Sequence, residues 1–190
     1  TAEAKAAHKI GLTPNMISGI GIILAILSAL AYAEWQNRPL YLLLATLLLL
    51  LSGFCDALDG AIARIYQQTT PFGGFLDSLL DRYADAIVYV GIITAELCHP
   101  LWGLTTLTGS LLVSYTRAKA EATNIKIESI GIAERAERII ILATASTIAT
   151  FWQPTTVMNT AIIILATLTN LTVIQRTLHV YKKLKKKETN

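Results

Sequence analysis

The stretch that decides the fold is Phe54–Ala86, FCDALDGAIARIYQQTTPFGGFLDSLLDRYADA. It carries five aspartates although apolar sequence flanks it on both sides. An ionised carboxylate in a helix that enters a membrane costs roughly 3 kcal/mol, so this group needs a compensating partner. Asp56 and Asp59 are three residues apart and Asp77 and Asp81 are four apart, so each pair shares one helix face.

The whole chain has the composition of a membrane protein. Of its 190 residues 53% are hydrophobic and 15% charged, and its mean hydropathy is +0.51, well outside the range of soluble domains. A bilayer crossing needs about 20 apolar residues, and a chain this short lacks the polar surface to coat six apolar helices in water. We predict an all-α integral membrane bundle, with residues 1–190 as one domain and transmembrane helices at 15–33, 39–65, 74–97, 101–122, 133–152 and 155–180.

The basic residues predict the orientation of the bundle. Six crossings place both termini on one side, and Lys and Arg collect at cytoplasmic ends. Only Arg38 falls on the opposite side, whereas the cytosolic side receives Lys5, Lys9, Arg64, Arg82, Arg117, Lys119, Lys126, Arg135, Arg138, Arg176, Lys182, Lys183, Lys185, Lys186 and Lys187. We therefore expect cytosolic N and C termini. The basic tail is expected to anchor the topology at membrane lipid headgroups rather than to bind nucleic acid.

The segment between the two aspartate pairs brings them together. The sequence YQQTTPFGG, Tyr66–Gly74, contains Pro71 and paired glycines, which break a helix and permit a tight reversal. The second and third helices are then antiparallel neighbours, and their carboxylates converge near the cytosolic face. Carboxylates this close require cations, and oxygen ligands without nearby Cys or His favour Mg²⁺, Mn²⁺ or Ca²⁺. The candidate metal ligands are Asp56, Asp59, Asp77 and Asp81.

A hard metal beside a water-accessible groove suggests phosphate chemistry, in which two ions ~4 Å apart hold phosphoryl oxygens. Gly60 would let a ligand approach the backbone, and Arg64 would supply a planar donor group. A cation or proton transporter is the alternative, since intramembrane acids also line ion pathways.

Further cations lie where the predicted groove opens. SYTRAKAEA (Ser114–Ala122) closes the fourth helix and GIAERAERIIIL (Gly131–Leu142) opens the fifth. Five basic residues form a candidate pocket for a phosphorylated acceptor: Arg117, Lys119, Arg135, Arg138 and Arg176. The alternative is that they only anchor helix ends, with Glu134 and Glu137 pairing Arg138 or Lys119 at the surface.

The aspartate pattern resembles the signature of the CDP-alcohol phosphotransferase family. It reads Asp56-x-x-Asp59-Gly60-x-x-Ala63-Arg64, eight residues, Gly73, three residues, Asp77, three residues, Asp81. The resemblance implies a six-helix membrane enzyme, usually a homodimer, that displaces CMP from a CDP-linked donor by attack of an acceptor hydroxyl. By that resemblance Asp56, Asp59 and Asp77 bind Mg²⁺ or Mn²⁺, expected as two ions, and Asp81 both binds metal and takes the hydroxyl proton. The nucleotide-side residues are Gly60, Ala63, Arg64 and Gly73.

A second resemblance concerns the acceptor. The blocks SYTRAKAEA, IAERAERIIIL and VIQRTLHV are similar to segments of the family's prokaryotic members that join a CDP-activated lipid to inositol 1-phosphate, the phosphatidylinositol-phosphate and archaetidylinositol-phosphate synthases. This likeness implies a multi-pass protein of a prokaryotic cell membrane, with its site facing the cytosol. It assigns the acceptor phosphate to Arg117, Lys119, Arg135 and Arg176, with Arg138 as a weaker candidate. Glycerol 3-phosphate or serine as acceptor, or CDP-inositol as donor, stay open as alternatives.

The N-terminal segment GLTPNMIS, Gly11–Ser18, is similar to the family's segment before the first helix. The resemblance places the CDP-lipid near Asn15, Met16, Ile17, Ser18 and Thr70. Helix capping by Asn15 after Pro14 is the alternative. Asp85 is not in the signature, and we expect it to support a metal ligand or to pair with a basic residue elsewhere in the bundle.

Overall fold

The computed structural model describes residues 3–5, 11–127 and 130–188, and these residues form helices and connecting loops without strands. A helical turn at residues 3–5 precedes six long helices: α2 (Pro14–Ala33), α3 (Leu40–Ile65), α4 (Pro71–Thr94), α5 (Pro100–Glu121), α6 (Arg135–Phe151) and α7 (Pro154–Glu188). The all-α prediction is confirmed. Lys9, assigned above to the cytosolic side, and the side chain of Lys187 lie outside the described residues.

The helix starts follow local sequence signals. Thr13 and Thr70 cap α2 and α4, because their side chains accept hydrogen bonds from the backbone N–H of Met16 and Gly73. A proline then stands in the first turn of each helix, where its missing N–H costs nothing. Pro71 and the paired glycines therefore begin α4, and the chain reverses over residues 66–70, slightly before the position expected. The cap of α2 is Thr13 and not Asn15.

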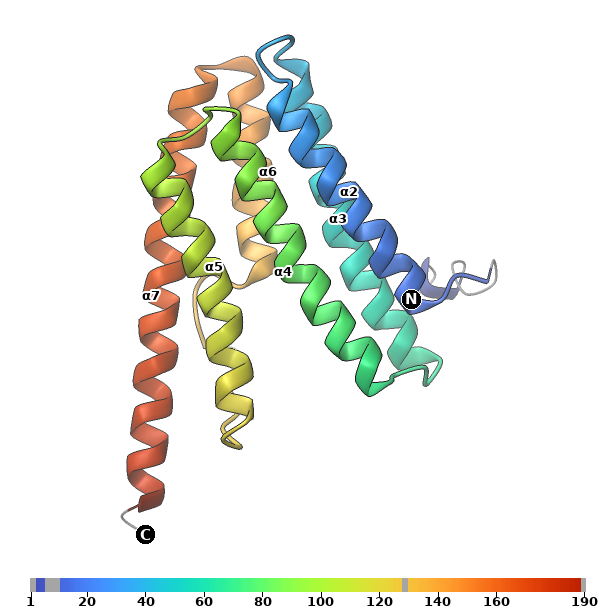
Figure 1. Cartoon of the computed structure of the whole chain (residues 1–190), viewed down its shortest axis with the longest axis vertical. Coiled ribbons are helices and arrows are strands. Elements are labelled where there is room, and N and C mark those ends of the chain that lie inside the picture. Colours follow the sequence, from blue (N-terminus) through green and yellow to red (C-terminus); the bar gives the residue numbers. More distant parts are fainter. Residues whose placement is uncertain (1–2, 6–10, 128–129, 189–190) are drawn as a thin grey trace.

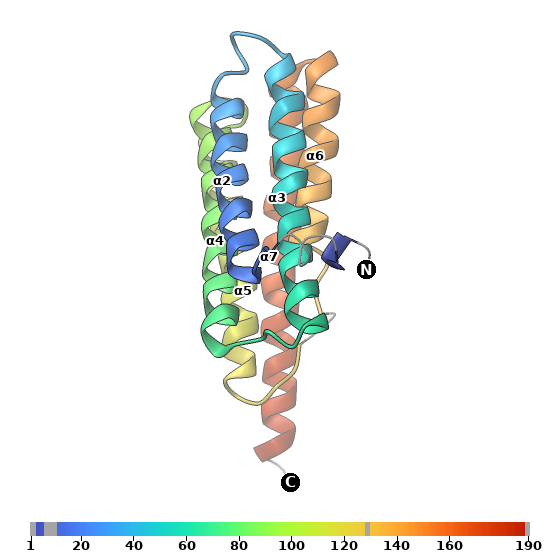
Figure 2. The same ribbon diagram turned by 90° about the vertical axis from the view of Figure 1, so that its right-hand side faces the viewer.

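The six helices run alternately up and down and close into a ring (Figures 1 and 2). Following the contacts around the ring, the order is α3, α2, α4, α5, α7, α6 and back to α3. The prediction that α3 and α4 pack as neighbours is therefore wrong in detail, because α2 packs against both and separates them. The helices α3 and α4 are antiparallel, as expected, and their aspartates face each other across the ring.

The apolar core lies in the upper half of the bundle in Figure 1, where the helices converge. It includes Tyr32, Leu42, Ile92, Leu142 and Met158, all nearly inaccessible to solvent. At Gly91 a Cβ atom would lie 2.8 Å from the backbone of Ala29, so α2 and α4 approach at a distance that only glycine permits. Toward the lower end the helices spread apart (Figure 1).

The loop between α5 and α6 runs from the lower end of α5 upward along the bundle. Helix α6 therefore begins well above the lower ends of its neighbours (Figure 1). Thr172 of α7 holds this link, since its hydroxyl oxygen accepts hydrogen bonds from the backbone N–H of Ile132 and Ala133. Gly131 has φ +128°, and a Cβ there would collide with Thr172 at 2.3 Å. The result is that Arg135, at the first position of α6, enters the interior of the ring.

Three helices, α2, α3 and α7, are long and apolar enough to cross a membrane. The other three are shorter or more polar, and α4 in particular carries Asp77, Asp81, Arg82 and Asp85. Helix α7 continues to Glu188, eight residues beyond its predicted end, because the basic tail contains no helix breaker. The bundle thus combines an apolar end with a charged, open end.

Candidate functional site

Three of the four predicted metal ligands form one group, which we call the metal group after its predicted role. Asp56 and Asp59 come from α3 and Asp77 comes from α4, and each offers a carboxylate oxygen within 4.8 Å of the others. Asp59 is buried, at 4% exposure. Three converging carboxylates are a donor set suited to a hard divalent cation such as Mg²⁺ or Mn²⁺, so the residues present fit the expected metal.

A serine from α2 fixes one of these carboxylates. Ser18 Oγ lies 2.5 Å from Asp59 Oδ2 and 3.1 Å from the carbonyl oxygen of Pro14. A hydroxyl has one hydrogen, so the short contact to the carboxylate is the stronger assignment. Ser18, expected beside the lipid donor, therefore contacts the metal group itself.

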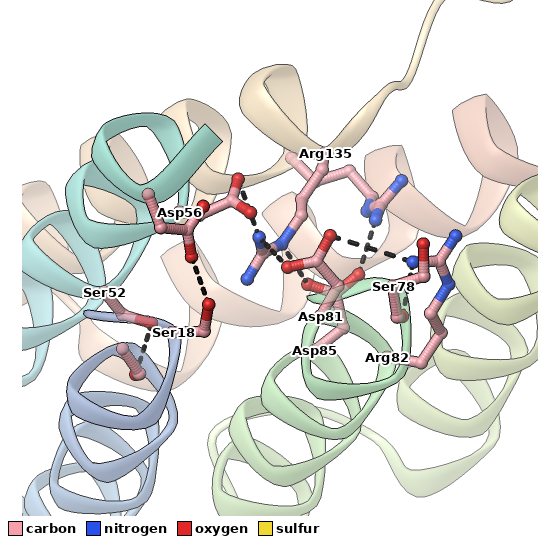
Figure 3. Close-up of polar contacts among 11 residues, drawn as sticks. Ser18, Ser52, Asp56, Ser78, Asp81, Arg82, Asp85 and Arg135 are labelled. Carbon is pink, nitrogen blue, oxygen red and sulfur yellow. Dashed lines mark hydrogen bonds and ion pairs between the residues drawn. The ribbon is translucent and has the colours of Figure 1, made fainter. Parts of the chain in front are cut away.

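The fourth aspartate, Asp81, is engaged by an arginine (Figure 3). Arg135 Nη1 lies between two carboxylates. It contacts Asp81 Oδ1, and it lies 2.9 Å from Asp56 Oδ2. Arg82 Nη1 also lies 3.7 Å from Asp81 Oδ2. Arg135 thus joins α6 to both α3 and α4, and a residue predicted to bind the acceptor contacts two of the predicted metal ligands.

A groove between the starts of α2 and α4 and the end of α3 collects most of the predicted donor residues. We call it the glycine groove, and it is lined by Asn15, Ser18, Asp59, Gly60, Ala63, Arg64, Thr70, Gly73 and Asp77 among others. A Cβ at Gly73 would lie 2.9 Å from Thr70 Oγ1, and one at Gly60 would lie 3.3 Å from Arg64 Nη1. Both glycines keep space that a side chain would take.

Two predicted donor residues do not line the glycine groove. Ile17 is buried in a small apolar cluster with Ala4 and Ile62. Met16 is 52% exposed and is not among the residues that line the groove. On a helix, four consecutive residues cannot all face one groove, and here Asn15 and Ser18 share the facing side.

On the other side of the aspartates lies a second groove, between α4, α5, α6 and α7. We call it the arginine groove, and its charged lining is Asp81, Arg82, Asp85, Arg117, Glu134, Arg135, Glu137, Arg138 and Arg176. Four of the five predicted acceptor residues line it. Lys119 does not, since it is exposed on α5 outside the groove.

The arginines of this groove already have partners within the chain. Arg176 donates to the carbonyl oxygens of Ile130 and Val113, both at 2.7 Å, and to Glu134 at 2.9 Å. Arg138, 3% exposed, donates to the carbonyl oxygen of Ala133 at 3.0 Å. Arg117 pairs with Glu121 at 3.1 Å on the exposed face of α5. Glu134 therefore pairs with Arg176, not with the residues expected from sequence.

Sequence gave one residue of the site no role there, and it left the role of a second open. Arg82 was read only as a marker of the cytosolic side, yet it borders the arginine groove beside Asp81. Asp85 was expected to support a metal ligand or to pair with a basic residue, and it contacts both Arg135 and Arg138. The i,i+4 spacing of Asp81 and Asp85 is a signal that could have placed Asp85 on the site face.

The chain matches known proteins over nearly its full length. Residues 11–182 match the sequence pattern described as CDP-alcohol phosphatidyltransferase. An archaetidylinositol phosphate synthase of Methanothermobacter thermautotrophicus is 42% identical over 179 residues, which cover 94% of this chain and 88% of that protein. A second protein of that description, from Pyrococcus horikoshii, is 42% identical over 144 residues, or 75% of this chain and 73% of that protein.

Solved structures resemble the chain in fold as well. The crystal structure of Mycobacterium tuberculosis phosphatidylinositol phosphate synthase with CDP-DAG bound matches with a TM-score of 0.80 at 28% identity, covering 95% of this chain and 92% of that one. The same enzyme in complex with manganese and citrate matches with a TM-score of 0.81 at 29% identity, covering 95% and 88%. The resemblance inferred from the aspartate signature is confirmed.

Proposed function

The chain belongs to the CDP-alcohol phosphatidyltransferase family, and on this premise we propose that it transfers a lipid phosphate group from a CDP-linked lipid to inositol 1-phosphate. The products are CMP and the lipid inositol phosphate. Relatives named as archaetidylinositol phosphate and phosphatidylinositol phosphate synthases support this acceptor. The donor lipid is of the diacylglycerol or archaeol type, and the bound CDP-DAG of the mycobacterial structure supports a CDP-lipid.

One observation carries the proposal: the two grooves meet at the aspartates. Asp77 lines the glycine groove and Asp81 lines the arginine groove, and both line one small cavity together with Asp56 and Asp59. A donor in the glycine groove and an anionic acceptor in the arginine groove would therefore approach each other at these carboxylates. Holding two reactants at a shared boundary is itself a large source of rate enhancement.

The metal group lies on the donor side. We propose that Asp56, Asp59 and Asp77 bind Mg²⁺ or Mn²⁺, and manganese in the mycobacterial relative supports the class of ion. Such an ion would offset the charge of the donor's diphosphate and of the departing CMP. We propose a second ion that draws on Asp81, for which Arg135 would first have to release Asp56 and Asp81.

The glycine groove binds the nucleotide end of the donor. Gly60 and Gly73 leave backbone accessible, and Arg64 lies against Gly60 with its guanidinium exposed to the groove. Asn15 and Thr70 add polar groups at the starts of α2 and α4, where helix N-termini favour phosphate oxygens.

Asp81 serves as the base in this mechanism. Its carboxylate accepts the proton of the acceptor hydroxyl as that oxygen attacks the phosphorus bonded to the lipid, and the phosphoanhydride bond to CMP breaks. Arg135 and Arg117 bind the acceptor's phosphate from the arginine groove. Arg138 and Arg176 are buried and hold the walls of that groove.

We propose that residues 1–190 form one domain with all six helices crossing the cell membrane of a prokaryote and the site facing the cytosol. Large apolar side chains exposed on α4, α5 and α6, such as Val90, Leu104 and Ile140, support lipid contact for the helices that also carry charge. The basic residues at the open end support its cytosolic position. We expect a homodimer, as the family resemblance implies.

The test is CMP release by the purified protein. CDP-archaeol and CDP-diacylglycerol are each supplied with inositol 1-phosphate, glycerol 3-phosphate or serine, in Mg²⁺, Mn²⁺ or chelator. We expect metal-dependent release with inositol 1-phosphate. Release only with another acceptor would reassign the arginine groove, and cation flux in liposomes without any CMP release would favour a transporter.

A further inference from the structure

A buried ion pair lies directly behind Arg135. Asp85 Oδ2 accepts from Arg138 Nη2 at 2.5 Å, and Asp85 Oδ1 accepts from Arg135 Nε at 3.4 Å. The Asp85 side chain is 14% exposed and that of Arg138 is 3% exposed. Asp85 therefore connects a fully enclosed arginine to the arginine that reaches the metal group.

Arg138 is fixed by more than this pair. Its Nη1 donates to the carbonyl oxygen of Ala133, the end of the link that leads into α6. The side chain also lines a small pocket with Tyr89 and Leu142. Arg138 therefore has little surface to offer a ligand and a rigid position from which to hold Asp85.

Arg135 uses different nitrogens for its two sets of partners. Nη1 contacts Asp56 and Asp81, whereas Nε faces Asp85. The contact with Asp85 can persist when Nη1 exchanges its carboxylates for another anion, because the two contacts do not compete for one hydrogen. Asp85 is thus placed to keep the guanidinium at the boundary of the arginine groove (Figure 3).

We propose that Asp85, held by Arg138, is a positioning residue that orients Arg135 toward the acceptor's phosphate group. The inference rests on the proposed function, since it concerns how the arginine groove binds inositol 1-phosphate. In this arrangement Arg138 holds Asp85 in place and does not itself contact the acceptor. A planar donor group binds a phosphate well only in a defined orientation, which is what a fixed carboxylate on Nε supplies.

Two simpler explanations of the Asp85–Arg138 pair predict a different change in acceptor binding. If Asp85 acted only through its negative charge, its removal would strengthen the binding of a phosphate nearby. If the pair acted only on folding, replacing both partners by uncharged residues of similar size would leave acceptor binding unchanged, because buried ion pairs are often replaceable in this way. A positioning role of Asp85 predicts weaker acceptor binding both when Asp85 alone is replaced and when Asp85 and Arg138 are replaced together.

The experiment compares wild type, Asp85→Asn, Asp85→Asn/Arg138→Met and the control Glu34→Gln, all as full-length protein in detergent with Mn²⁺. Glu34 lies at the opposite end of the bundle, where it accepts from Asn37. Inositol 1-phosphate binding is measured by calorimetry without donor, and KM and kcat are measured by CMP release. We expect both Asp85 variants to raise the acceptor Kd and KM about tenfold with a smaller change in kcat, and Glu34→Gln to match wild type.

The double variant keeps the test valid if Asp85→Asn alone fails to fold, since that single change leaves Arg138 charged and unpaired. In an Arg135→Ala background Asp85→Asn should add less than about twofold to KM, because no side chain remains to be positioned. Acceptor binding equal to or tighter than wild type in the double variant overturns the positioning role alone. Wild-type protein that neither binds inositol 1-phosphate nor uses it overturns the proposed function, and the positioning role with it.

Discussion

The glycine groove and the arginine groove flank the same aspartates but handle charge in opposite ways. On the glycine side, Asp59 and Asp77 have no salt-bridge partner among the described residues, and Asp59 is held by a serine hydroxyl. On the arginine side, Arg135, Arg138 and Arg176 each contact a carboxylate of the chain. On one side two carboxylates lack a salt-bridge partner among the described residues, and on the other three arginines are paired with carboxylates of the chain.

The difference shows how each side must bind its ligand. Carboxylates that face one another without a cation gain from any divalent ion that enters, so the glycine side favours metal and then diphosphate. The arginines must exchange an internal partner for an external anion, so acceptor binding there is an exchange of ion pairs. The net free energy gained by the acceptor is smaller than it would be at an unpaired arginine, because an internal ion pair must be broken first.

The largest expected effect is at Asp81, where the two sides meet. Asp81→Asn should lower kcat by about 10²–10⁴, since the amide cannot accept the hydroxyl proton. Binding of the CDP-lipid should change little, because the three grouped carboxylates remain. CMP release at saturating substrates, with donor binding measured separately, checks this. Turnover at the wild-type rate would remove Asp81 from the role of base.

Arg135→Ala should weaken acceptor binding in the arginine groove and strengthen Mn²⁺ binding at the aspartates. The acceptor KM should rise about 10- to 100-fold, the value of a lost charged hydrogen bond. Mn²⁺ binding without substrates should become tighter, because Asp56 and Asp81 lose an internal cation. Calorimetric Mn²⁺ titration gives the answer, with Arg38→Ala at the other end of the bundle as control. Weaker Mn²⁺ binding would contradict the proposed competition.

Gly73→Ala tests the space on the donor side. The added Cβ would lie 2.9 Å from Thr70 Oγ1 and 3.5 Å from Asn15 Oδ1, so both groove and helix cap must shift. The donor KM should rise about 20-fold, with about 1 kcal/mol lost in stability from the cap. Gly74→Ala, in the same turn but with nothing within 4 Å of the new Cβ, should have a much smaller effect on KM. Equal effects of the two changes would argue against a steric role for Gly73.

Ser18→Ala tests the support of the metal group. Loss of the hydroxyl that contacts Asp59 should weaken Mn²⁺ binding about tenfold without altering the acceptor KM. The matched control is Ser28→Ala, whose buried hydroxyl donates to the Ala45 carbonyl oxygen at 2.8 Å. That change should cost about 1 kcal/mol of stability and leave metal affinity unchanged. The idea fails if Ser18→Ala binds Mn²⁺ as wild type does.

The smallest effect concerns the edge of the arginine groove. Arg117 lines the groove and Lys119 does not, although sequence assigned both to the acceptor. Lys119→Ala should change the acceptor KM by less than about twofold, as expected of an exposed charge, and Arg117→Ala should raise it several times more. Steady-state kinetics with inositol 1-phosphate decide between them. A larger effect at Lys119 would place the acceptor outside this groove.

Local patterns predicted much of the fold. Long apolar runs gave six helices with bounds close to those found, because bilayer-length helices are determined by composition over about 20 residues. The prediction went wrong where a capping threonine starts α4 at Pro71 and where the lysine tail continues α7. Neither error moved an aspartate from the face to which its spacing had assigned it.

The aspartate group was predictable for a related reason. Spacings of three and four fix a helix face, and a short reversal fixes which ends of two helices lie together. The serine that holds Asp59 and the pairing of Asp85 with Arg138 were not predictable, since their partners are 41 and 53 residues away. No periodicity in one helix encodes contacts at such separations.

By itself the sequence determined the helical bundle, the charged end and the carboxylates proposed to bind metal, all of which depend on residue type and on spacing within one or two turns. The tertiary structure alone decided that α2 separates α3 from α4 and that Arg135 enters among the aspartates. It also decided which basic residues share a groove. The physical reason is that these outcomes depend on how the ring closes and on how far the link before α6 reaches into it, and both follow from packing of the whole chain.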